Sequence, residues 1–255
     1  RNTTRSGMTI GLVATASFLI LAMSAFRLAP SDQGSGGFRW LGRSATPIYG
    51  DLAAAAVRRE VLGSAALPGD ALVYSMRLKP GDDASCRNLY QSTQPQVYGV
   101  TQPFIERYDD KQKVAFGWAQ HAAIPSGEPD NPWRLLLNES DDSAIPIVVD
   151  NNTAMYSLHW YGGVGAEYEL TYDDGQTVNV RVVGLLANSV LQGALLMSES
   201  NFKETFPTVS GYRLFLVDAS EDEAQDNGGL VAYLENGLSD QGFDLTSTVQ
   251  LLDDL

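Results

Sequence analysis

An uncharged and mostly apolar run near the amino end limits what this chain can fold into. From Met8 to Phe26, nineteen consecutive residues carry no charged side chain. As an α-helix this run is about 28 Å long, close to the roughly 30 Å hydrocarbon thickness of a bilayer. We therefore expect a membrane-spanning helix, with residues 1–30 forming the span and its flanks.

Two other structures fit parts of this pattern. A cleavable signal peptide also has a basic start and an apolar run, but this run is long for a signal core and the chain does not begin with Met. A buried core helix is the other alternative, for which nineteen uncharged residues are many. Arg1 and Arg5 precede the run, so the positive-inside bias places the amino end in the cytosol and the residues after about 28 outside it.

The remainder of the chain is strongly acidic. Residues 28–255 hold 14 basic against 31 acidic side chains, which gives a formal charge of -17 at pH 7. A surface this negative repels phosphate backbones, so nucleic-acid binding is not expected. The charge suits a solvated domain that is held away from anionic lipid.

The pattern after the apolar run predicts an α+β domain. Hydrophobic residues make up 44% of the chain, enough for a packed core. A β-α-β pattern occurs at each end of the domain. The predicted elements are strands 37–42 and 71–77 around a helix from Asp51 to Leu62, and strands 212–219 and 243–249 around a helix from Ser220 to about Leu238.

A β-rich stretch separates the two β-α-β patterns. Its clearest feature is Asp174-Gly175 between two alternating runs, 167–172 and 177–184, which predicts a tight β-hairpin. Strands 97–101, 113–117 and 145–150 and short helices at 152–159 and 199–205 are also predicted. We therefore expect one β-α-β subdomain, residues 31–95 and 208–255, interrupted by an inserted β-rich subdomain, residues 96–207.

Several segments resemble the MacB/FtsX-type permeases of ABC transporters. They are Arg5-Ser6 with MTIGLVATASFLI, GDDASCRNLYQ (81–91), QVYGV (96–100), residues 164–200 and GYRLFLVDA (211–219). The resemblance implies an N-terminal transmembrane helix followed by a MacB-like periplasmic domain, in which a β-α-β, porter-like subdomain is interrupted by a β-rich, sabre-like one. Such permeases have four or more helices per unit, so this chain, with one span, is expected to be a fragment.

The resemblance also implies a function. The chain would be the extracytoplasmic domain of a permease in the bacterial inner membrane, coupling cytosolic ATP hydrolysis to export or to mechanotransmission. Its partners would be a cytosolic ABC ATPase subunit, a second permease copy and a periplasmic partner or a lipoprotein or peptide cargo. The alternative is a membrane-anchored sensory or ligand-binding domain.

The residues themselves predict no catalytic, cofactor-binding or metal-binding site. No GxxxxGK[ST] loop occurs, so the ATPase is expected on another subunit, and no GxSxG elbow indicates a hydrolase. Cys86, His121 and His159 are each isolated, and GGVG at 162–165 lacks the third glycine of a dinucleotide loop. Acid pairs recur at residues 82–83, 109–110, 141–142 and 173–174; we expect solvated loop charges, with weak calcium binding as the alternative.

Overall fold

The computed structural model describes residues 3–25, 32–81, 94–138, 144–172, 175–219 and 229–254. The chain divides into two compact units, Arg1–Pro30 and Ser31–Leu255. The first contains the helix α1 (Thr3–Ala25), so the helical conformation predicted for this segment is confirmed. In the part of the chain that the structure describes, no helix meets the length and apolarity needed to cross a membrane. The membrane span predicted for residues 8–26 is therefore not confirmed.

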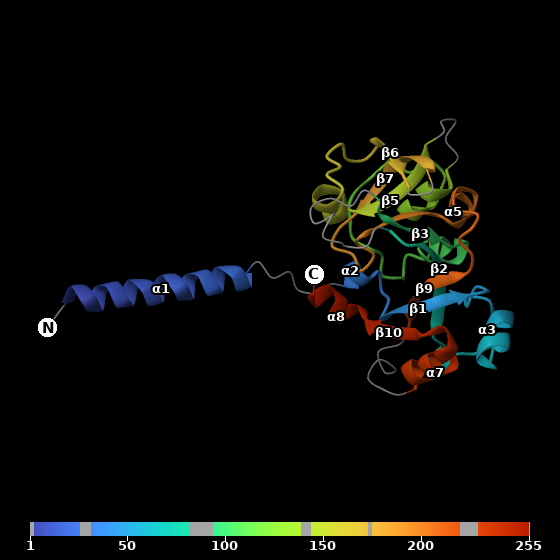
Figure 1. The fold of residues 1–255 in the computed structure, drawn as a ribbon, viewed down its shortest axis with the longest axis horizontal. Helices are drawn as coiled ribbons and strands as arrows, with labels where there is room; N and C mark the ends of the chain where they lie inside the picture. Colours follow the sequence, from blue (N-terminus) through green and yellow to red (C-terminus); the bar gives the residue numbers. More distant parts are fainter. Residues whose placement is uncertain are drawn as a thin grey trace. The chain divides into compact units, whose positions relative to one another are not determined.

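The second unit is a mixed α/β domain (Figure 1). Its strands are β1 (Trp40–Ile48), β2 (Leu72–Lys79), β3 (Gln96–Val100), β4 (Trp118–His121), β5 (Ile145–Asp150), β6 (Glu167–Thr171), β7 (Thr177–Leu186), β8 (Ala194–Ser198), β9 (Tyr212–Asp218) and β10 (Phe243–Ser247). Its α-helices are α2 (Asp32–Ser35), α3 (Ala55–Leu62), α4 (Gln102–Arg107), α5 (Glu199–Thr205), α7 (Leu230–Gly237) and α8 (Thr248–Asp253). The short 3-10 and π turns are η1 (Pro68–Asp70), η2 (Pro132–Leu137), η3 (Thr153–Ser157) and η4 (Ser239–Gln241).

Within the described residues, all ten strands belong to one sheet in the order β10-β1-β9-β2-β3-β8-β5-β7-β4, with β6 paired to β7. The four strands β10-β1-β9-β2 are antiparallel to their neighbours. With α3 following β1 and α7 following β9, they form the split β-α-β arrangement of a ferredoxin-like unit. We call these elements the flanking subdomain. The strands β3 to β8 extend its sheet from β2, and we call residues 96–207 the inserted subdomain.

Alternating side chains explain how the sheet is covered on both faces. In β2, Tyr74 and Met76 enter one core cluster, whereas Val73 enters another on the opposite face. The period of two in a strand produces this division. The helices α3 and α7 cover the face of Val73, where Leu234 is fully buried. The sheet is continuous from the flanking subdomain into the inserted subdomain, so it does not mark a boundary between them. The subdomain boundaries at residues 95 and 208 therefore stay a prediction.

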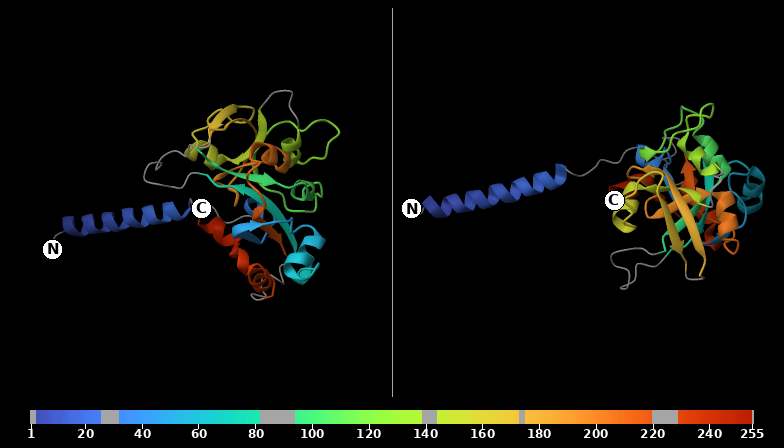
Figure 2. Two further views of the ribbon diagram at one scale, coloured as in Figure 1. Left: turned by 45° about the vertical axis from the view of Figure 1, so that its right-hand side comes forward. Right: turned by 90° about the horizontal axis from the view of Figure 1, so that it is seen from above.

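The hairpin predicted at Asp174-Gly175 is present as β6 and β7, whose register pairs Thr171 with Thr177. The right-hand view of Figure 2 shows it as neighbouring yellow and orange strands. Gly175 has a φ of 78°, the left-handed conformation that glycine adopts without strain. Asp174 lies outside the described residues.

Two local predictions were displaced. The strand predicted at 113–117 is instead β4, which begins at Trp118. Asp51 does not cap a helix, because α3 begins four residues later and Asp51 accepts a hydrogen bond from the Ala53 backbone N–H. The short helix predicted at 152–159 is present, with the π turn η3 as its main part. The predicted capping box at Ser220 and Glu223 lies outside the described residues.

Candidate functional site

Two neighbouring parallel strands end together in the middle of the sheet. β3 and β8 pair in parallel, and their last residues, Val100 and Ser198, are register partners. The helix α4 follows β3 and packs Phe104 into the core on one face. The helix α5 follows β8 and packs Phe202 into the core on the opposite face. In open α/β sheets, ligands bind at the carboxyl ends of strands where two connections leave in opposite directions.

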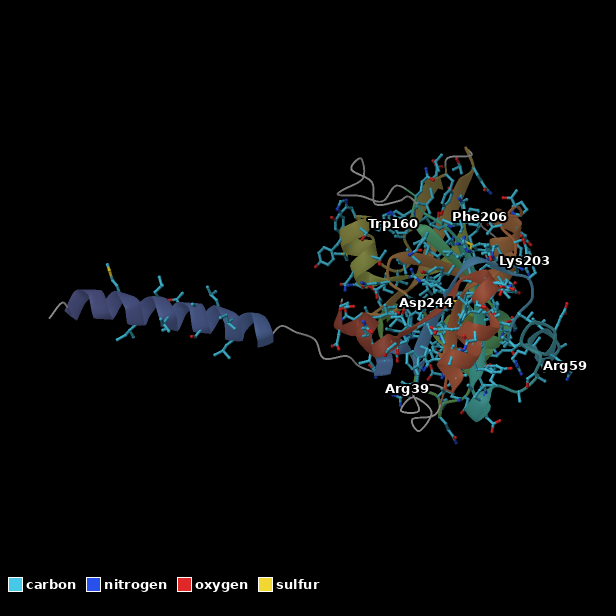
Figure 3. All side chains as sticks on the ribbon, turned by 60° about the horizontal axis from the view of Figure 1, so that its bottom comes forward. Arg39, Arg59, Trp160, Lys203, Phe206 and Asp244 are labelled. Atoms are coloured by element: carbon cyan, nitrogen blue, oxygen red, sulfur yellow. The ribbon has the colours of Figure 1, made fainter. Side chains whose placement is uncertain are left out.

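A cleft of about 410 Å³ opens at this place. Its volume falls within the range of roughly 300–1,000 Å³ that is typical of small-molecule sites. Its apolar lining consists of Val100, Ile105 and Leu137. Its polar lining consists of Gln102, Ser198, Glu199, Ser200, Lys203 and Glu204. Figure 3 labels Lys203, a residue of α5 that lines the cleft.

Glu199, the first residue of α5, carries the densest polar contacts beside the cleft. Its Oε1 accepts hydrogen bonds from Arg77 Nε at 2.8 Å and from the Tyr212 hydroxyl at 2.8 Å. Lys203 Nζ lies 2.9 Å from the same oxygen. The Arg77 guanidinium also lies over the Tyr212 ring, 4.8 Å from its centroid. We call Arg77, Glu199, Lys203 and Tyr212 the Glu199 cluster.

The Glu199 cluster perturbs the titration of its members. Burial opposes ionisation of Glu199, but the hydrogen bonds from Lys203, Arg77 and Tyr212 outweigh it, and the pKa of Glu199 is lowered. Burial and the hydrogen bond to Glu199 both raise the pKa of Tyr212 well above its usual value. The cluster is therefore an ionised carboxylate held by two cations and a neutral phenol. It links α5 of the inserted subdomain to β2 and β9 of the flanking subdomain.

A second link between the subdomains is built around Arg107 at the end of α4. Its side chain is 2% exposed, and its Nη2 donates to Asp218 Oδ2 at 2.9 Å. Lys113 Nζ lies 3.1 Å from the same carboxylate oxygen. The guanidinium lies 4.5 Å from the centroid of the Phe38 ring and 5.2 Å from that of Tyr108. Aromatic faces and a carboxylate compensate the burial of this charge in part, since Nε and Nη1 of Arg107 have no hydrogen-bond partner among the described residues.

The acid pair at residues 109–110 has a structural role. Asp109 forms a forked ion pair with Arg134 and accepts a hydrogen bond from Asn131, and these contacts lower its pKa. Asp110 accepts the backbone N–H of Gln112 in a turn. The pairs at 82–83, 141–142 and 173–174 lie outside the described residues. Within the residues that the structure describes, no group of three or more His, Cys, Asp or Glu side chains could hold a metal ion.

The two histidines considered in the sequence analysis do not lie at one site. His121 lies against the edge of the Trp118 ring, and its Nδ1 is 2.8 Å from the Ala122 carbonyl oxygen. His159 stacks on Tyr161 with ring centroids 6.2 Å apart. Neither histidine lines the cleft. Cys86 lies outside the described residues.

Asp150 is a buried carboxylate that the sequence analysis did not single out. It ends β5, is fully buried, and accepts backbone N–H groups of Asn152 and Ser189, both at 2.9 Å. Burial raises its pKa above the usual value despite these hydrogen bonds. Its contacts fix the backbone after β5, and it is not among the residues that line the cleft.

No family model matches the sequence, and no curated protein matches it significantly. Its fold is similar to that of the periplasmic region of MacB from Actinobacillus actinomycetemcomitans. That match has 11% sequence identity, a TM-score of 0.42, and covers 87% of this chain and 94% of the other.

A second solved structure gives a similar result. It is the extracellular domain of the noncanonic ABC-type transporter YknZ from Gram-positive bacteria, with 11% identity and a TM-score of 0.37. The match covers 82% of this chain and all of the other, 100%.

Proposed function

We propose that this chain is the extracytoplasmic domain of an ABC transporter permease subunit, which couples cytosolic ATP hydrolysis to export or to mechanotransmission across the bacterial inner membrane. Its partners in this proposal are a cytosolic ABC ATPase subunit, a second permease copy and a periplasmic partner or a lipoprotein or peptide cargo. The chain itself is not an enzyme. The proposal rests on the sequence resemblance and on the adjacency of the helices α2 and α8.

The observation that carries the proposal is the adjacency of the first and last elements of the domain. The helices α2 and α8 pack side by side (Figure 1). Thr248 Oγ1 donates to the Phe38 carbonyl oxygen at 2.7 Å, and Leu252 lies against Gly34. A domain with adjacent first and last elements can be carried as an insertion in a larger protein. This is the arrangement that an external domain joined to a membrane part at one place requires.

Coupling also needs stiff contacts that pass force from one part of the domain to another. The Glu199 cluster and the Arg107–Asp218 pair each join a helix of the inserted subdomain to strands of the flanking subdomain. The continuous sheet joins the same two parts through β2 and β3. The domain would therefore move as one body when its attachment moves, and present the inserted subdomain to cargo or to a partner.

Reconstitution with the ATPase subunit in lipid nanodiscs tests the proposal. We expect no ATP hydrolysis by the permease protein alone and steady hydrolysis by the complex. Replacing the Walker A lysine of the ATPase subunit should abolish it, which assigns the activity to the partner. ATP hydrolysis by this chain alone, or failure to form a complex with any ABC ATPase of its organism, would contradict the proposal.

A sensory or ligand-binding domain is the second candidate, and the cleft at the ends of β3 and β8 favours it. The full gene product separates the two functions. Additional membrane spans and an associated ATPase indicate a permease. A histidine-kinase or methyl-accepting region on the same polypeptide indicates a sensor.

A further inference from the structure

The strand β6 forms an open edge of the sheet. It pairs with β7 on one side, and among the described residues no strand pairs with its other side. The two ends of the strand order are less open. At β10 the Leu245 N–H is already engaged, since it donates to Glu235 Oε1. At β4 the strand is short, and its register with β7 is interrupted by an irregularity. The edge of β6 is therefore the one best suited to accept another strand.

The register of the hairpin fixes which backbone groups of β6 face this edge. The Val182 N–H donates to the Ala166 carbonyl oxygen at 3.0 Å, directly before the strand. Bonded and non-bonded residue pairs alternate along an antiparallel ladder, so the even-numbered residues of β6 bond to β7. The N–H and C=O groups of the odd-numbered residues therefore point to the open edge. These residues are Glu167, Glu169 and Thr171.

One face of β6 is acidic beside this edge. The side chains of Glu167, Glu169 and Thr171 are exposed and share this face. Glu167 forms an ion pair with Arg181 of β7, whereas no described cation pairs with Glu169. The segment 167–181 holds 4 acidic residues and 1 basic residue. Like charges that lie opposite each other destabilise a strand pair, so this edge disfavours a second copy of itself and favours a basic strand.

The other face of β6 carries an aromatic pair. The rings of Tyr168 and Trp160 stack with their centroids 4.1 Å apart, and both side chains are partly exposed. The Gly162 N–H donates to the Tyr168 hydroxyl at 3.0 Å and helps to hold this ring in place. An added strand would place every second side chain on this face, beside the rings. Apolar side chains suit those positions.

We propose that β6 accepts an extended segment of a partner protein as an additional antiparallel strand, with basic residues opposite Glu167 and Glu169 and apolar residues between them. Main-chain hydrogen bonds would supply affinity, and the alternating side chains would supply selectivity. The formal charge of -17 on residues 28–255 would attract such a segment over a distance. In Figure 1, β6 lies at the opposite end of the domain from α7. The inference goes beyond the proposed function and does not depend on it.

Titration of the full-length protein with matched, fluorescently labelled heptapeptides tests this inference. The probe alternates lysine and valine, and its first control carries glutamate in place of each lysine. Fluorescence anisotropy measures both affinities. We expect the lysine peptide to bind about tenfold tighter than the glutamate peptide, since cross-strand ion pairs replace like-charge pairs. Equal affinities, or no binding of the lysine peptide, would overturn the proposal.

Backbone N-methylation separates strand addition from simple charge attraction. Lysines opposite the two glutamates direct their N–H groups to β6, whereas the valines between them direct theirs away. N-methylation of the lysines should therefore weaken binding about tenfold or more. The same number of methyl groups on the valines should leave the affinity unchanged. Equal affinities of the two methylated peptides would show that no strand is added and would refute the inference.

Variants of the protein then locate the site. Glu169→Lys should weaken binding of the lysine peptide about tenfold. Glu60→Lys makes the same charge change at an exposed position of α3 and should leave the affinity unchanged. Thr171→Pro removes an edge-facing N–H without changing the charge, and an edge strand tolerates proline at such a position. It should weaken binding at the wild-type unfolding temperature.

Wild-type affinity in Glu169→Lys or in a folded Thr171→Pro protein would contradict the assignment to β6. The oligomeric state of the protein tests the occupant. Self-association that Thr171→Pro abolishes would identify a second copy of β6 as the added strand, and would overturn the choice of a basic partner segment.

Discussion

Glu199 shows how one side chain can join two parts of a sheet. Its Oε1 receives contacts from β2, from β9 and from its own helix, and the side chain is only 18% exposed. Hydrogen bonds to a charged group contribute more to stability than neutral ones, because a buried charge left without partners is costly. The stability of the domain should therefore depend on this carboxylate.

Glu199→Gln removes the charge and keeps the shape of the side chain. We expect a loss of about 1–3 kcal/mol in the free energy of unfolding, because Arg77 and Lys203 lose their shared anion. Urea denaturation at pH 7 measures it. The control Glu60→Gln, on an exposed face of α3, should stay within about 0.5 kcal/mol of wild type. Equal values for the two variants would contradict the role of Glu199.

The stability difference between wild type and Glu199→Gln should also depend on pH. The pKa of Glu199 is lowered in the folded state from its usual 4.5, so its contribution is complete above that pH and is lost as the pH falls through the lowered value. The stability difference between wild type and Glu199→Gln should be full at pH 7 and should shrink below about pH 4. A difference that is constant from pH 7 to pH 3 would show that ionisation of Glu199 does not contribute.

Sequence reasoning could not find the Glu199 cluster. Arg77 and Glu199 are separated by 122 positions and meet only because β3 pairs with β8 in parallel. The sequence predicted the helix at 199–205, but it did not predict the strand β8 before it, and no local pattern fixes which strands pair. A signal was nevertheless present, since Glu199 directly follows the apolar strand ALLMS. In open α/β sheets, ligand-binding residues lie at the carboxyl ends of strands.

At the scale of elements, the buried cation Arg107 links α4 to the flanking subdomain, beside the packing of Phe104 on Phe38 and Tyr74. Arg107→Ala should destabilise the domain by about 1.5–3 kcal/mol, because Asp218 loses a charged hydrogen bond and the Phe38 and Tyr108 rings lose their contact. Lys113→Ala removes the more exposed partner of Asp218 and should cost less than about 1 kcal/mol. Urea denaturation compares the two variants. Similar losses for both would mean that burial of Arg107 contributes nothing.

Elements with strong periodicity were predicted well, and elements set by distant contacts were not. The range of β5 and that of α5 agree with the predictions, and Gly63 ends α3 with a φ of 75°. β4 was misplaced because its position depends on pairing with β7, which begins 56 residues after His121. The interleaving of the two β-α-β units could not be predicted either. Their strands pair across the ends of the chain, β1 with β9 and β10, and β2 with β9.

At the scale of the molecule, the membrane span at residues 8–26 is a prediction of the sequence alone. Single cysteines at positions 3 and 49, in a Cys86→Ser background, test it by labelling in intact cells and spheroplasts; Tyr49 is 75% exposed. The prediction requires that an impermeant maleimide reaches position 49 and not position 3, which should react only after the membrane is permeabilised. Reaction of both positions from the same side would eliminate the span.

The central claim is that this domain moves with ATP turnover by a cytosolic partner. Its most direct test is a distance between two permease copies, measured by double electron–electron resonance on the reconstituted transporter. A spin label at Tyr161→Cys, in the Cys86→Ser background, replaces a side chain that is 69% exposed in the inserted subdomain. The account predicts that the distance between the two labels shifts by several ångströms between the nucleotide-free and ATP-bound transporter. An unchanged distance distribution in a complex that hydrolyses ATP would contradict it.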